Sequence, residues 1–258
     1  MAVAALLTIA AGVGTFLWQS GGITAETGKA AQNASTAAAA AGFDTQDKAA
    51  IEAIVRAYIL ANPEIIPEAV QLLQTRQAAK RIDAVRASLE TPFAGAYTGN
   101  PDGDVVLVEY SDFACGFCRQ SVSDVARLVN EDKNLKIVFH ELPILSDESR
   151  VAAAWGLAAA QQGKYYAFYK AMFGAGKPSQ ATIEQSARTA GLDMAAARSF
   201  AAAKTTDEVI DANIRIAQQL EFSGTPSWVV GNKVLNGAVG YDDLKAAIDE
   251  ARAARVAG

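Results

Sequence analysis

The chain has two cysteines, and both lie in the tetrapeptide Cys115-Gly116-Phe117-Cys118. When two thiols have this spacing where a strand turns into a helix, the first lies at the helix N-terminus and the second one turn inside. The unpaired N–H groups and the dipole of a helix N-terminus stabilise a thiolate, and they lower its pKa from about 8.5 to as little as about 3.5 in known cases. The second thiol lies close enough to form a disulfide with the first. The spacing therefore predicts a redox-active dithiol.

A zinc site, a haem site and a chance pair of thiols each have less support in the sequence than a redox-active dithiol. A zinc site needs four ligands, and the two cysteines with the single histidine, His140, supply only three. A c-type haem site needs a histidine directly after the second cysteine, where this chain has Arg119. A chance spacing of two buried thiols is the third alternative. We therefore expect neither a bound metal nor a cofactor.

His140 also raises the alternative of a cysteine hydrolase, because a thiolate and an imidazole together form a nucleophile. The histidine follows Phe139 near the end of an expected strand. At such a place a histidine is more often an ordinary surface or core residue, so we favour exchange chemistry over hydrolysis.

The residues on either side of the cysteines predict a β-α-β unit that positions them. Residues 104–111 are apolar and rich in β-branched side chains, which is typical of a strand buried on both faces, and the cysteines follow within a few residues. Residues 121–129 have apolar side chains at helical spacing, and residues 135–142 form a second apolar strand before Pro143. A strand, a helix and a strand of these lengths imply a parallel pair of strands.

Residues 149–222 have the pattern of several helices, and residues 226–230 and 233–235 predict two further strands before a last helix from Tyr241. The chain of 258 residues is 51% hydrophobic, which is enough for a sizeable core. Its net charge of −5 weighs against a nucleic-acid partner, which normally requires a basic surface.

The N-terminal part of the chain has a different composition. Residues 2–18 carry no charge, and a helix of that length would span about 26 Å, just short of a hydrocarbon core of about 30 Å. We expect residues 1–25 to be a signal peptide or a membrane anchor. Residues 26–43 are mainly alanine and small polar residues with almost no large apolar side chain, which predicts a flexible linker because they cannot bury enough apolar surface to become ordered.

Residues 44–90 form the expected helical arm, interrupted at Asn62-Pro63 because a residue before proline avoids the helical region. The apolar stripe of this arm has no core of its own. It must therefore pack on another chain or on the domain that follows, and we favour pairing between subunits. The arm is a candidate oligomerisation segment.

Residues 108–118, Val-Glu-Tyr-Ser-Asp-Phe-Ala-Cys-Gly-Phe-Cys, and residues 224–226, Gly-Thr-Pro, resemble the DsbA-like branch of the thioredoxin superfamily of bacterial envelope proteins. The resemblance implies a thioredoxin-like α/β fold over residues 91–258, with an inserted helical domain at about 146–222. Residues 58–65 of the arm resemble the N-terminal arm of ScsC-like and Com1-like members, some of which are oligomeric.

The resemblance also implies roles for individual residues. Cys115 is then the attacking thiol and Cys118 the resolving one. Thr225 and Pro226, with a cis bond between them, form the loop that holds the substrate backbone. The two residues between the cysteines adjust the thiolate and the contact surface; they are Gly116 and Phe117.

Glu109 stands six residues before Cys115, in the place of a semi-buried carboxylate that in relatives carries a proton to the second cysteine. Burial in an apolar strand would raise the pKa of this carboxyl, which suits proton transfer. The alternative is a glutamate at a strand end that faces water.

The resemblance implies a thiol:disulfide oxidoreductase that acts on unfolded or misoxidised exported proteins in the periplasm, free or tethered to the inner membrane, with a membrane redox partner. An oligomeric disulfide isomerase or reductase assembled by the arm is the alternative, because Thr225 and the Gly-Phe pair resemble isomerases more than strong oxidases. A redox-inert chaperone is a third option, and the presence of both cysteines argues against it.

Overall fold

The computed structural model describes residues 28–257 and divides the chain into two compact units, Met1–Val70 and Gln71–Gly258. The expected signal peptide or membrane anchor, residues 1–25, lies outside the described residues. No helix within residues 28–257 is both long enough and apolar enough to cross a membrane.

The first unit is helical in its described part. Residues 28–40 form a helix, and α2 (Thr45–Ala61) follows, with Asp44 as its N-cap in a reciprocal capping box with Asp47. The prediction of a flexible linker over residues 26–43 missed the first of these helices. Alanine has the highest helix propensity, so a stretch that cannot form a core can still form a helix. No residue of α2 is buried.

The second unit is built on a sheet with the strand order β1-β3-β2-β4-β5. Strands β2 and β3 are parallel, and the other three neighbouring pairs are antiparallel. The strands are β1 (Tyr97–Gly99), β2 (Val105–Ser111), β3 (Leu135–Glu141), β4 (Ser227–Val230) and β5 (Lys233–Asn236). The predicted β-α-β unit is confirmed, since α4 (Gly116–Glu131) connects β2 to β3.

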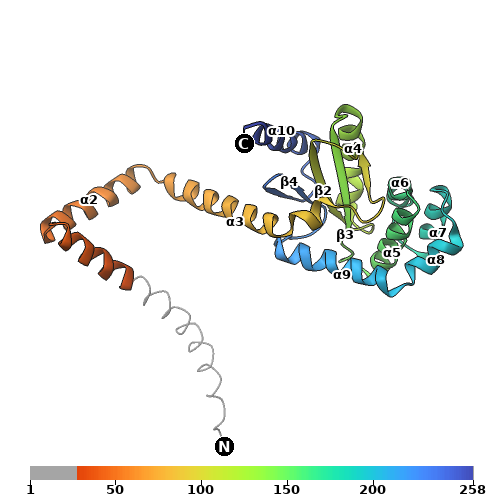
Figure 1. The fold of residues 1–258 in the computed structure, drawn as a ribbon, viewed down its shortest axis with the longest axis horizontal. Helices are drawn as coiled ribbons and strands as arrows, with labels where there is room; N and C mark the ends of the chain where they lie inside the picture. The colour runs from red at the N-terminus through yellow and green to blue at the C-terminus, as the bar shows by residue number, and fades with distance from the viewer. Residues whose placement is uncertain (1–27, 258) are drawn as a thin grey trace, which may run out of the picture. The chain divides into compact units, whose positions relative to one another are not determined.

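The helical insertion lies between β3 and β4 and confirms the predicted thioredoxin-like architecture (Figure 1). Its helices are α5 (Asp147–Gln161), α6 (Tyr165–Ala175), α7 (Gln180–Thr189), α8 (Met194–Ala201) and α9 (Lys204–Gln219). A last helix, α10 (Tyr241–Ala257), follows β5.

The sheet is covered on both faces, as the apolar strand patterns predict. Alternate side chains of a strand point to opposite faces. Leu107 and Phe139 belong to the core shared with α4, α6 and α10, whereas Val108 and Val138 belong to the core on the other face. The helix α3 (Ile65–Glu90), which spans the boundary between the two units, contributes its C-terminal part to this second core.

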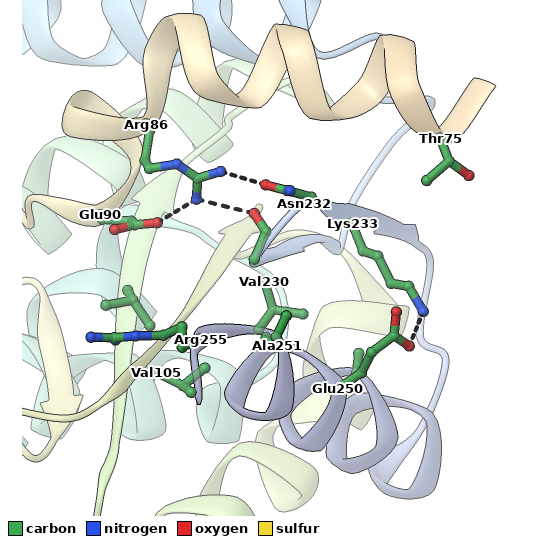
Figure 2. Close-up of a pocket in the computed structure, with 14 residues that line it drawn as sticks. Thr75, Arg86, Glu90, Val105, Val230, Asn232, Lys233, Glu250, Ala251 and Arg255 are labelled. Carbon is green, nitrogen blue, oxygen red and sulfur yellow. Dashed lines mark hydrogen bonds and ion pairs between the residues drawn. The ribbon is translucent and has the colours of Figure 1, made fainter. Parts of the chain in front are cut away.

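The C-terminal part of α3 is thus packed on the thioredoxin-like domain of the same chain. Ile82 and Leu89 are fully buried. Arg86 donates hydrogen bonds to the carbonyl oxygen of Gly231 at 3.1 Å and to Asn232 Oδ1 at 2.6 Å, in the turn between β4 and β5 (Figure 2). The C-terminal part of α3 therefore packs on its own chain. This was the less favoured of the two expectations for the arm.

Candidate active site

Cys115 is the N-cap residue of α4, with extended backbone angles, and Cys118 lies in the first turn. This is the arrangement that the spacing of the cysteines predicts. The Cys115 sulfur accepts a hydrogen bond from the N–H of Cys118 at 3.4 Å, and its thiol donates to the carbonyl oxygen of Thr225 at 3.1 Å. Both cysteines are free thiols, and both are buried.

The two thiols have opposite electrostatic environments. The pKa of Cys115 is lowered to about 5, mainly by a hydrogen bond from the Cys118 thiol, with support from Thr225 and nearby N–H groups. These contributions outweigh the opposing effect of burial. The pKa of Cys118 is raised, first by burial and then by Cys115 and the charge of Glu109. Cys115 therefore ionises first and is the stronger candidate for the nucleophile.

Glu109 is fully buried on β2, so the alternative of a glutamate that faces water is wrong. The hydroxyl of Tyr169, on α6, donates to its two carboxylate oxygens at 3.3 and 3.1 Å. Burial raises the pKa of Glu109 to about 8, against the effect of this hydrogen bond, and the charge of Cys115 adds to the rise. A carboxyl group with such a pKa can exchange a proton near neutral pH.

The loop before β4 lies beside the cysteines because β2 and β4 are antiparallel neighbours. Tyr110, near the end of β2, pairs with Ser227 at the start of β4. The Thr225–Pro226 bond is cis, as the resemblance implies. The structure thus brings together three site residues predicted from distant parts of the sequence: Cys115, Thr225 and Pro226.

Gly116 and Phe117 lie between the thiols, and the Phe117 side chain is 62% exposed. A Cβ atom added at Gly116 would meet no other atom within 4 Å, so the site does not require glycine for lack of space. The apolar ring of Phe117 is thus exposed to solvent two residues after Cys115.

His140 does not belong to this site, so the hydrolase alternative is wrong. Its Nε2 lies 2.9 Å from the carbonyl oxygen of Leu89, and its Nδ1 lies 3.2 Å from Asn213 Oδ1. Its ring stacks on Tyr110, on the face of the sheet opposite Glu109, and burial lowers its pKa. His140 is a core residue that joins β3 to α3 and α9.

Two buried carboxyl groups near the cysteines were not predicted. Glu141, at the end of β3, accepts a hydrogen bond from the Tyr165 hydroxyl at 2.8 Å, and burial raises its pKa well above the ordinary value. Asp112, directly after β2, is buried as well. Each is an acidic residue at the end of an apolar strand, and this pattern could have indicated them, whereas Glu109 was identified by its resemblance to a carboxylate of relatives.

Within residues 28–257, no three histidine, cysteine, aspartate or glutamate side chains are grouped so that they could hold a metal ion. A cavity of about 600 Å³ lies between α3, the turn from β4 to β5 and α10 (Figure 2). None of the residues around the cysteines lines it.

Two family models match the chain. The model described as thioredoxin matches residues 90–250, and the model described as the N-terminal domain of the copper resistance protein ScsC matches residues 47–80. The curated relatives include the Na⁺/H⁺ antiporter NhaA 1 of Salinispora arenicola, 27% identical over 156 residues, which are 59% of this chain. The match spans only about a quarter, 24%, of the length of that antiporter.

Three solved structures show the same fold. A thioredoxin-like oxidoreductase from Silicibacter pomeroyi is 40% identical, with a TM-score of 0.62 over 65% of this chain and 97% of that one. The thiol-disulfide exchange protein α-DsbA2 from Wolbachia pipientis is 23% identical, with a TM-score of 0.64 over 69% and 97% of the two chains. Proteus mirabilis ScsC is also 23% identical, with a TM-score of 0.62 over 83% and 98%.

The thioredoxin model covers more than half of the chain, and the 40% identical oxidoreductase is covered over nearly its whole length. The chain therefore belongs to the thioredoxin family.

Proposed function

We propose that this chain exchanges disulfides with exported proteins, with Cys115 as the nucleophile and Cys118 as the resolving thiol. The observation that carries the proposal is the contrast between the two thiols. Cys115 lies at a helix N-terminus with its pKa lowered to about 5, whereas the pKa of the buried Cys118 is raised. Cys115 can therefore attack as a thiolate, whereas Cys118 stays protonated until the second step of the exchange.

The exchange proceeds in two steps. In the reduced protein, the Cys115 thiolate attacks one sulfur of a substrate disulfide, and a mixed disulfide forms as one substrate thiolate leaves and takes up a proton. Cys118 then loses its proton, and its thiolate attacks the Cys115 sulfur and releases the second substrate thiolate. The substrate gains two electrons and the enzyme is left with a disulfide. The reverse sequence oxidises a substrate dithiol.

Glu109 is the proton acceptor that this proposal assigns to Cys118. Burial keeps the Cys118 thiol protonated, so its attack needs a base. Glu109 has a pKa of about 8, and its charge acts on the Cys118 thiol. A base whose pKa is near the working pH transfers protons most effectively.

The loop with the cis bond and the residues between the cysteines are proposed to contact the substrate. The Thr225 carbonyl oxygen lies 3.1 Å from the Cys115 sulfur, so the backbone of this loop is next to the reacting atom. Thr225 and Pro226 would hold the substrate backbone there. Gly116 leaves open space, and the exposed Phe117 ring offers an apolar contact.

The proposed compartment is the periplasm, with unfolded or misoxidised exported proteins as substrates and a membrane protein as redox partner. The uncharged residues 2–18 and the relation to DsbA-like proteins support this placement. Whether the N-terminal segment is cleaved or remains as an anchor is a question for mass spectrometry of the mature protein.

A second candidate function is that of an oligomeric disulfide isomerase or reductase. The match of residues 47–80 to the ScsC N-terminal domain favours it, together with the apolar side chains that α2 and the start of α3 leave exposed. These side chains are called the arm surface below; they are Ile51, Ile54, Val55, Tyr58, Leu60, Ile66, Val70, Leu72 and Leu73.

The reduction potential of the Cys115–Cys118 couple, measured with a scrambled-ribonuclease assay, distinguishes the two functions. A potential of about −120 mV without isomerase activity indicates an oxidase, and one of about −180 mV with isomerase activity indicates an isomerase. A Cys115→Ser variant that still reduced insulin would contradict the assignment of the nucleophile.

A further inference from the structure

Asp112 is a buried carboxylate that the exchange chemistry leaves without a role. It follows β2 directly, three residues before Cys115, and is only 1% exposed. Its Oδ1 accepts a hydrogen bond from the N–H of Ala114 at 2.8 Å. Its Oδ2 accepts from the N–H groups of Ile144 and Leu145 at 2.9 and 3.0 Å. One side chain therefore joins the Cys115 loop to residues 142–146, the segment between β3 and α5.

The backbone of Asp112 is hydrogen-bonded to the backbone of Cys115. Its carbonyl oxygen accepts a hydrogen bond from the N–H of Cys115 at 2.9 Å. Because the same residue bonds Cys115 and the segment 142–146, that segment is held beside the Cys115 loop.

The joined segment carries large apolar side chains in solvent. Ile144 is 50% exposed and Leu145 is 54% exposed, and the 62% exposed Phe117 follows Cys115 closely. Exposed apolar side chains that are grouped and held in place are typical of an interaction surface. Hydrogen bonds to a carboxylate are about twice as strong as neutral ones, so the carboxylate is an effective anchor for this segment.

We propose that Asp112 is a positioning residue for polypeptide substrates, acting through Ile144 and Leu145. It holds these side chains beside the Cys115 loop, where an unfolded chain with apolar residues next to its cysteine can pack. A small disulfide without such residues reaches Cys115 without this contact. The inference rests on the proposed function. It attributes to Asp112 part of the preference of this chain for protein substrates over small disulfides.

The test compares two probes, insulin and oxidised glutathione, with the reduced full chain and its Asp112→Asn variant. The asparagine NH₂ group cannot accept a hydrogen bond, so part of the link is lost. We expect the KM for insulin to rise about tenfold, with a much smaller change in kcat, because one net hydrogen bond to a charged group is lost. The ratio of the insulin rate to the glutathione rate should fall by a similar factor.

A second variant, Ile144→Ser with Leu145→Ser, removes the exposed apolar groups and leaves Asp112 in place. It should lower the same ratio, and combining it with Asp112→Asn should cause no further loss, since the two changes act on one contact. Because both side chains are half exposed, this variant tests the proposal even if the Asp112 variant fails to fold.

Asp193→Asn is the matched control, because Asp193 also accepts two backbone N–H bonds, at the N-terminus of α8. It should leave the ratio of the two rates unchanged. The inference is overturned if Asp112→Asn lowers both rates in proportion, if its effect adds fully to that of the serine variant, or if the control changes the ratio. A wild-type chain that reacts with neither probe would instead overturn the proposed function.

Discussion

At the scale of residues, one helical turn separates two thiols with opposite acidities. Cys115 receives hydrogen bonds at a helix N-terminus, while Cys118 is covered by the core and faces the charge of Glu109. The same α-helix therefore provides both a stabilised thiolate and a thiol that stays protonated. The proposed direction of attack follows from this difference, since the nucleophile in disulfide exchange is a thiolate.

The pKa of Cys115 gives the first prediction. In the reduced protein, titration followed by thiolate absorbance should show a midpoint at about 5, below the usual value of 9.0. Since the folded pKa is the lower one, the thiolate stabilises the reduced fold above pH 9.0, and this contribution is lost as pH falls from there through about 5. Urea unfolding of the reduced and oxidised forms at several pH values measures the difference.

The control for this titration is Cys118→Ala, which removes the hydrogen bond that contributes most to the low pKa. Its midpoint should rise above that of the wild type. A wild-type midpoint above about 8, in the range of an ordinary cysteine, would contradict the prediction.

Glu109→Gln gives the second prediction. The variant cannot accept the Cys118 proton, so the release of the mixed disulfide should slow by about 10²-fold or more, the usual contribution of a general base. In the wild type this step should become faster as pH rises through about 8, and the variant should lack that dependence. Stopped-flow measurement of product release checks both results, and equal rates would contradict the role.

The stability of the variant tests the same residue independently. The folded pKa of Glu109, about 8, is above the ordinary value of 4.5. Its contribution to stability is therefore complete below pH 4.5 and is lost as pH rises through about 8. Glu109→Gln should remove this loss, so the variant should become more stable relative to the wild type as pH rises.

At the scale of elements, α3 has two different parts. Its C-terminal part buries Ile82 and Leu89 against the sheet, and Arg86 bonds the turn between β4 and β5. Its N-terminal part leaves Ile66, Val70, Leu72 and Leu73 exposed. The helical insertion also contributes to the site, because α6 supplies the hydroxyls of Tyr169 and Tyr165 to Glu109 and Glu141.

The third prediction concerns the difference between the buried C-terminal part of α3 and the exposed arm. Ile82→Ala should lower the free energy of unfolding by about 2–5 kcal/mol, because it opens a cavity in a packed core. Ile54→Ala is the matched control, since that side chain is 68% exposed. It should change the unfolding of the isolated monomer by less than about 0.5 kcal/mol. Denaturant unfolding at low protein concentration compares them, and similar losses would show that the division is wrong.

At the scale of the whole molecule, the proposed functions differ in whether they require assembly. The proposed oxidase can be a monomer or an oligomer, whereas the isomerase alternative uses the arm surface for assembly. That surface contains nine large apolar side chains, more than scattered single residues on a soluble protein require.

The fourth prediction concerns this assembly. Light scattering of the full chain should give a mass above that of the 27.0 kDa monomer. The double variant Ile54→Glu with Leu60→Glu should return the mass to one chain, because carboxylates cannot be buried in an apolar interface without a partner. Ile54→Leu should keep the assembly. A monomeric wild type would remove the oligomeric alternative.

The sequence by itself determined the features that depend on neighbouring residues. The cysteine spacing after an apolar strand specified the helix N-terminus at Cys115, and the order of patterns specified the β-α-β unit and the helical insertion. These inferences succeeded because helical and strand periodicity and helix-terminal chemistry act over a few residues. The helix at 28–40 does not follow from the small buried surface of this segment; it reflects the high helix propensity of its alanines.

Only the tertiary structure decided which distant side chains meet. Burial by the fold raises the pKa of Glu109 to about 8, and the fold also brings to its carboxyl group the hydroxyl of Tyr169, sixty residues later, whose hydrogen bond opposes that rise. The link from Asp112 to the segment 142–146, the core position of His140 and the split role of α3 arise in the same way. Burial and long-range hydrogen bonds depend on how elements pack, and no local pattern in the chain records that packing.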